Sequence, residues 1–117
     1  MWTAASKDYA TFIVNKVILE PRPESNLDLL LFSYHCNLSR RICSGSKNLK
    51  LLWEVVKLPE YTPDNTVLID DFDEVFDTQP NNCIRAPEFH FKHENSESDT
   101  FLIDKVIPVL DQFKTLA

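Results

Sequence analysis

The chain has 117 residues, of which 44% are hydrophobic and 26% charged, so it can form one globular domain over residues 1–117 and is neither disordered nor fibrous. Its formal net charge of -6 argues against a sequence-independent nucleic-acid binder, because such proteins neutralise phosphates with a basic surface. The one glycine, Gly45, excludes the glycine-rich phosphate loops of nucleotide-binding folds.

Neither a membrane span nor an export signal is visible in the sequence. No apolar run reaches the ~18 residues that a span requires, and Met1 is not followed by the basic and apolar regions of a signal peptide. Cys36, Cys43 and Cys83 show no Cys-x-x-Cys spacing, so they predict neither a disulfide framework nor a zinc site. We therefore expect a soluble protein of the nucleus or cytoplasm, without membrane or nucleic-acid partners.

The first predicted element is a helix that begins near Thr3 and ends before Pro21. Thr3 is a good candidate for the N-cap, and proline cannot continue a helix. Apolar side chains recur at helical spacing along one face of this segment. They are Tyr9, Phe12, Ile13 and Val17.

The next stretch predicts a strand, a loop and a second helix. Residues 27–34 form an apolar run of strand length. Residues 35–46 lack periodicity and predict a loop with local basic character. From Lys47 onward the apolar spacing predicts an amphipathic helix that Pro59 ends.

The second half of the chain predicts a strand over residues 67–70, another apolar stretch over residues 83–91 and a final helix. Ser98 or Asp99 can cap that helix, whose buried stripe would be Leu102, Val106, Leu110 and Phe113. Pro108 should bend the helix near Asp104, where one amide hydrogen bond is lost. This order of elements indicates an α/β layer fold.

Two adjacent carboxylates, Asp70 and Asp71, directly follow the predicted strand of residues 67–70. The carboxyl ends of strands are where open α/β sheets place their ligands, so this pair is the candidate chemical centre. Equally, the pair could form a strand-end turn in which an aspartate accepts backbone hydrogen bonds.

Three separated motifs resemble the haloacid dehalogenase superfamily, in the branch of the RNA polymerase II C-terminal-domain phosphatases. The segment from Trp2 to Ala10 is similar to the second motif of that branch, with a hydroxyl residue after a strand and a Tyr-Ala pair on the helix. Lys47-Asn48-Leu49 resembles the third motif and Val67-Leu-Ile-Asp70-Asp71 the fourth. The tail, from Pro80-Asn-Asn82 to Ile107-Pro108, extends the resemblance over nearly the whole chain.

This resemblance implies a three-layer α/β domain with a mostly parallel sheet and a Mg²⁺-dependent phosphatase that forms an aspartyl-phosphate. Thr3 would donate a hydrogen bond to a phosphate oxygen, and Lys47 would neutralise phosphate charge. Asp70 and Asp71 would hold Mg²⁺. The substrate would be a phosphoprotein.

The sequence departs from the family at its start and in its third motif. The first motif, a strand followed by Asp-x-Asp-x-Thr, should precede Thr3, and it supplies the nucleophile, the acid/base and the central strand. We therefore expect a truncated, inactive chain with unpaired strand edges that favour a homodimer or strand exchange. Asn48 also stands where the family has aspartate, and Cys83 where a small residue is common.

Alternatives remain for each site residue. Thr3 could be only an N-cap, and Lys47 only a solvated lysine. Asp71-Phe-Asp73 formally resembles the first motif itself, which would make Asp71 the nucleophile. At the level of function, the alternative to a phosphatase is a catalytically dead remnant that serves as an interaction or structural module.

Overall fold

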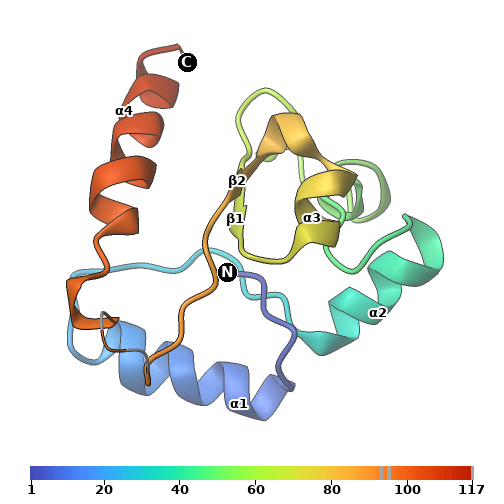
Figure 1. The fold of residues 1–117 in the computed structure, drawn as a ribbon. Coiled ribbons are helices and arrows are strands. Elements are labelled where there is room, and N and C mark those ends of the chain that lie inside the picture. The colour runs from blue at the N-terminus through green and yellow to red at the C-terminus, as the bar shows by residue number, and fades with distance from the viewer. Residues whose placement is uncertain (93, 95, 117) are drawn as a thin grey trace. The chain divides into compact units, whose positions relative to one another are not determined.

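The computed structural model describes residues 1–92, 94 and 96–116, and its main helices and strands are labelled in Figure 1. The chain divides into two compact units, residues 1–51 and residues 52–117. Whether they form the single domain that the sequence predicts stays a prediction.

The start of the first unit is held by a short parallel pairing. Trp2 forms a bridge with Leu31, the Thr3 N–H donates to the Leu31 carbonyl at 3.0 Å, and the Leu31 N–H donates to the Met1 carbonyl at 2.8 Å. The strand predicted over residues 27–34 is therefore reduced to one bridged position. It is short because a helix begins at Ser33.

The first helix comprises α1 (Lys7–Phe12) and a wider π-helical continuation (Ile13–Leu19), and it ends before Pro21 as predicted. Its N-cap is Ser6, whose Oγ accepts a hydrogen bond from the Tyr9 N–H at 3.3 Å. The prediction of Thr3 as the N-cap is therefore wrong. Thr3 and Ser6 both carry a hydroxyl that can cap a helix, and the sequence alone does not show at which of them the helical backbone begins. The predicted apolar face is largely exposed, and Ala10 and Val14 are the buried positions.

A second helix, α2 (Ser33–Ile42), replaces the loop predicted over residues 35–46. Its buried positions are Cys36 and Ser39, which are small and lie three residues apart on one face. Such a face has no large apolar residue, and the periodicity was therefore not visible in the sequence. The predicted helix after Lys47 is present only as a short π-helical segment, Leu51–Val55.

In the second unit, strands β1 (Leu68–Asp70) and β2 (Cys83–Arg85) form a two-stranded parallel sheet. Leu68 pairs with Cys83 and Asp70 with Arg85. Asn82 fixes the entry to both strands, since its side-chain amide donates to the Pro63 carbonyl at 2.7 Å and to the Thr66 carbonyl at 2.9 Å. This small parallel sheet, in a chain of mixed helices and strands, agrees with the predicted α/β class in its coarse form.

Helix α3 (Asp73–Thr78) connects the two strands and was not predicted. The last helix consists of a π-helical turn (Leu102–Val106) followed by α4 (Ile107–Leu116), drawn in red in Figure 1. The change of helix type lies next to Pro108, which has no N–H to donate to the Asp104 carbonyl, and the bend expected near Asp104 stays a prediction.

Buried apolar side chains occur in both units. Leu49, Leu51 and Cys36 lie in the first, and Val75, Cys83 and Val106 in the second. Val106 is the buried member of the stripe predicted for the last helix, whereas Leu102 is 60% exposed. Among the described residues, no helix combines the length and the apolar composition needed to cross a bilayer.

Candidate functional site

Asp70 and Asp71 lie where the sequence places them, at the carboxyl end of β1. Asp70 is half-buried and Asp71 exposed. One carboxylate oxygen of Asp70 accepts a hydrogen bond from the Phe72 N–H at 2.9 Å, which is the strand-end turn of the alternative interpretation. This bond engages only part of a carboxylate that has two oxygens and about four lone pairs, so it is compatible with a metal-binding role as well.

A polar hollow of about 390 Å³ opens beside Asp71 at this end of the sheet. Its wall comes from the start of α3, the end of β2 and the chain that follows β2, and Arg85 of β2 forms an exposed ion pair with Asp73 of α3. The Ala86 N–H donates to the Asp70 carbonyl at 2.9 Å and holds this chain against the strand. The residues that line the hollow are Asp71, Phe72, Asp73, Arg85, Ala86, Pro87 and Glu88.

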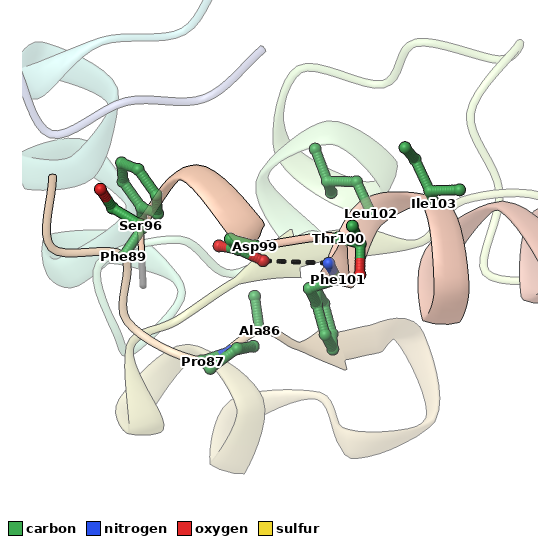
Figure 2. Close-up of a pocket in the computed structure, with 9 residues that line it drawn as sticks. All are labelled: Ala86, Pro87, Phe89, Ser96, Asp99, Thr100, Phe101, Leu102 and Ile103. Carbon is green, nitrogen blue, oxygen red and sulfur yellow. Dashed lines mark hydrogen bonds between the residues drawn. The ribbon is translucent and has the colours of Figure 1, made fainter. Parts of the chain in front are cut away.

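A second hollow, of about 530 Å³ and mostly apolar, adjoins the first and shares Ala86 and Pro87 with it. Figure 2 shows its lining, which continues from Phe89 to the start of the last helix at Phe101 and Leu102. A hydrogen bond of 3.0 Å from the Phe101 N–H to the Asp99 carboxylate fixes the turn at its rim. The carboxyl edge of the sheet therefore combines an acidic hollow with an apolar one.

Thr3 lies in the first unit, half-buried, at the end of the pairing with Leu31. Its Oγ1 accepts a hydrogen bond from the Ala5 N–H at 3.1 Å. The Cys36 thiol donates to the Thr3 carbonyl over 3.6 Å. A hydroxyl that accepts in this way can still donate its own hydrogen, which is the role that the resemblance implies for Thr3.

Lys47 is half-buried in a loop that Asn48 holds together. The Asn48 side-chain amide donates to the carbonyls of Cys43, at 2.8 Å, and Ser44, at 3.0 Å, and its Oδ1 accepts from the Lys50 N–H at 3.0 Å. Ser44 and Gly45 have positive φ angles of 70° and 87°, so the loop requires such support. Sequence reasoning noted Asn48 only as a departure from the family and missed this role.

Two further titratable groups have shifted pKa values. Burial, together with the neighbouring Asp70 charge, raises the pKa of the Cys83 thiol, so this cysteine stays protonated and is no candidate nucleophile. Burial lowers the pKa of His35, whose Nδ1 accepts a hydrogen bond from the Phe32 N–H at 3.0 Å at the start of α2. A neutral His35 is the form that can accept this bond.

The two carboxylates at the end of β1 match the type and the number of protein ligands that Mg²⁺ commonly has. Mg²⁺ prefers oxygen ligands and is commonly held by one or two carboxylates while it keeps several waters. Within residues 1–92, 94 and 96–116, no three His, Cys, Asp or Glu side chains gather into a fuller cage. Asp70 and Asp71 would therefore hold the ion as a partial site that substrate oxygens complete.

The four predicted site residues fall into two groups. Thr3 and Lys47 belong to residues 1–51, whereas Asp70 and Asp71 belong to residues 52–117. Each group is placed within its own unit, and their assembly into one phosphate site stays a prediction.

All 117 residues match the family model described as NLI interacting factor-like phosphatase. The chain belongs to the NLI interacting factor-like phosphatase family. The resemblance to the C-terminal-domain (CTD) phosphatase branch of the haloacid dehalogenase superfamily is thereby confirmed. The match covers both units and every motif discussed above.

Two curated proteins of invertebrate iridescent viruses are similar to this chain, and both are named "Putative CTD phosphatase-like protein 355R". The protein of Invertebrate iridescent virus 6 is 42% identical over 106 residues, covering 88% of this chain and 58% of that protein. The protein of Invertebrate iridescent virus 3 is 36% identical over 122 residues, covering 97% and 62%. The chain thus spans about three fifths of the length of these relatives. No solved structure matches it significantly.

Proposed function

We propose that this chain provides the phosphate-binding and metal-binding residues of a Mg²⁺-dependent phosphatase that acts on phosphoserine or phosphothreonine in proteins of the nucleus or cytoplasm. The observation that carries the proposal is the pair of adjacent carboxylates at the end of β1, beside a polar hollow, in a member of this phosphatase family. Phosphoryl transfer depends on placing opposite charge around the phosphate, and the chain has the side chains for that task.

Each proposed role follows from the chemistry of the side chain. Thr3 would donate its hydroxyl hydrogen to a phosphate oxygen, and the Lys47 ammonium would neutralise charge on the same group. Asp70 and Asp71 would hold Mg²⁺, which supplies charge neutralisation at the phosphate when it is bound. The turn that Asp70 forms with the Phe72 N–H directly precedes the hollow that Asp71 lines.

The group that forms the aspartyl-phosphate is proposed to lie in the first motif, which the family places ahead of the Thr3 motif. In support, the two curated relatives are longer than the part that this chain matches. We therefore propose that residues 1–117 alone do not turn over a phosphate ester. A protein that includes the first motif would do so.

Hydrolysis of an aryl phosphate in the presence of Mg²⁺ tests this division of roles. We expect no turnover above buffer from residues 1–117. Turnover by residues 1–117 would overturn the proposal, and a phosphorylated enzyme that forms in the wild type with its phosphate on Asp71 would identify Asp71 as the nucleophile. A longer protein with an intact first motif that also stays inactive would favour the catalytically dead interaction module.

A further inference from the structure

The charges of this acidic protein are unevenly distributed along the chain. Residues 52–117 contain five Lys or Arg against fourteen Asp or Glu, whereas residues 1–51 contain seven against four. The excess of positive charge is concentrated in residues 29–53, which contain no acidic residue. The cations of this segment are Arg40, Arg41, Lys47 and Lys50, named here the basic cluster.

Buried hydrogen bonds link the segments that carry this cluster. Ser39 is fully buried, and its Oγ donates to the Gly45 carbonyl at 2.5 Å and accepts from the Asn48 N–H at 3.0 Å. The last turn of α2, with Arg40 and Arg41, is thereby fixed to the loop with Lys47. Asn48 in turn accepts from the Lys50 N–H, so each cation lies within two residues of the same network.

The outer members of the basic cluster are exposed and lack acidic partners. Arg40, Arg41 and Lys50 are exposed, and within the described part of the chain none of them forms an ion pair. The Arg40 guanidinium donates only to the neutral Asn37 side chain, at 3.0 Å. The helix dipole accounts for Arg40 and Arg41, because cations are favourable at the C-terminus of α2. It does not account for Lys50 or for the absence of acidic residues over the 25 residues from 29 to 53.

We propose that the basic cluster binds a second phosphate or carboxylate group of the substrate, next to the phosphate that Lys47 receives. The preferred substrate is then a protein segment with several phosphorylated or acidic residues close together. Like charges held together repel, and an anion relieves that repulsion, with arginine offering a planar fork that matches phosphate. This inference rests on the proposed function, since it assigns Lys47 to the first phosphate.

Binding of two labelled peptides to the full chain, measured by fluorescence anisotropy, tests the proposal. Both peptides share one sequence, and they contain one phosphoserine or two, with the spacing of the second varied. We expect the doubly phosphorylated peptide to bind roughly tenfold more tightly at its best spacing, because it gains charge-assisted contacts. The double variant Arg40→Glu/Arg41→Glu should abolish that gain and retain binding of the singly phosphorylated peptide.

A matched control removes the same charge elsewhere in the first unit. Lys16→Glu/Arg22→Glu also replaces two exposed cations by two acids, and it should preserve the gain. Arg40→Gln/Arg41→Gln avoids acidic side chains at the end of α2 and should still lose the gain with an unchanged circular dichroism spectrum. The proposal would be overturned if the wild type did not bind the doubly phosphorylated peptide more tightly. It would also be overturned if this gain in affinity persisted in the Arg40/Arg41 variants or fell equally in the control.

Two further outcomes distinguish this inference from the proposed function of Lys47 and from a nucleic-acid site. If Lys47→Met leaves binding of the singly phosphorylated peptide unchanged, the proposed function fails at Lys47, even where the Arg40/Arg41 effect is present. If an oligouridylate of equal charge binds more tightly than the doubly phosphorylated peptide, the cluster is a nucleic-acid site and the inference is wrong.

Discussion

At the scale of single residues, Asn48 explains how the chain tolerates a departure from its family. Its amide group donates to two loop carbonyls, and a carboxylate has no hydrogen with which to do so. Asn48 is 8% exposed, so water cannot readily replace these bonds. The loop that carries Lys47 therefore depends on asparagine at this position.

Asn48→Asp, which restores the residue usual in the family, should destabilise this chain by about 3 kcal/mol at neutral pH, because it buries a charge against two carbonyl oxygens. The carbonyls would raise the pKa of the new carboxyl above its unfolded value. Its destabilising effect should therefore be largest at neutral pH and shrink as the pH falls and the group becomes protonated. Urea denaturation at pH 7 and pH 5 measures this difference.

Asn37→Asp is the control for this experiment, since Asn37 is exposed on α2 and gains the same charge. We expect it to change stability only slightly at either pH. An Asn48→Asp variant that is as stable as the wild type at neutral pH would show that the amide bonds do not hold the loop.

At the scale of elements, the sequence predicted β1 and the first and last helices, whereas the apolar run of residues 27–34 forms only one bridge and the helix after Lys47 is short. The run from Val67 to Ile69 announced β1, and proline marked the ends or breaks of three helical segments. Helix α2 could not be recognised because its buried face is made of Cys36 and Ser39, and the buried Ser39 matters through hydrogen bonds that appear only after folding. Helix α3 had a readable signal, Asp73 and Glu74 in its first turn, which the sequence prediction did not use.

The same limit applies to the candidate site. Asp70 and Asp71 could be placed because they end an apolar strand, and their turn was one of the two predicted arrangements. Asn48 supports the loop of Lys47 through hydrogen bonds to loop carbonyls such as that of Cys43. The loop sequence has no periodic pattern that would indicate these bonds. Long-range and loop contacts are thus what the sequence could not supply.

Strand β1 has one edge that no strand of the described residues pairs with, since the sheet contains β1 and β2 alone. Ile69, at its centre, is 38% exposed. We propose that this edge pairs with a strand from a second copy, because unpaired edges offer free N–H and carbonyl groups. Light scattering should then show a dimer that forms as the concentration rises.

Ile69→Lys should shift this association to roughly tenfold higher concentration, because a charge at a strand edge opposes pairing. Val109→Lys is the matched control, an equally drastic change at an exposed position of α4. A monomer at all concentrations, or an equal effect of the control, would contradict pairing through β1.

At the scale of the whole molecule, the proposed function draws on residues of both compact units. Thr3, Lys47 and the basic cluster belong to residues 1–51, which contain an excess of cations. Asp70 and Asp71 belong to the strongly acidic residues 52–117. In the proposed function, Thr3 and Lys47 contribute a hydrogen-bond donor and a cation, and Asp70 and Asp71 contribute the metal ligands.

The most direct measurement is an NMR titration of the ¹⁵N-labelled chain with Mg²⁺ and inorganic phosphate together. We expect the amide signals of Thr3, Lys47, Asp70 and Asp71 to shift with one common midpoint. Asp70→Asn/Asp71→Asn should abolish the shifts near β1 and weaken those at Thr3 and Lys47. Signals that shift with separate midpoints, that do not respond, or that are unaffected by the double variant would contradict a shared phosphate and metal site.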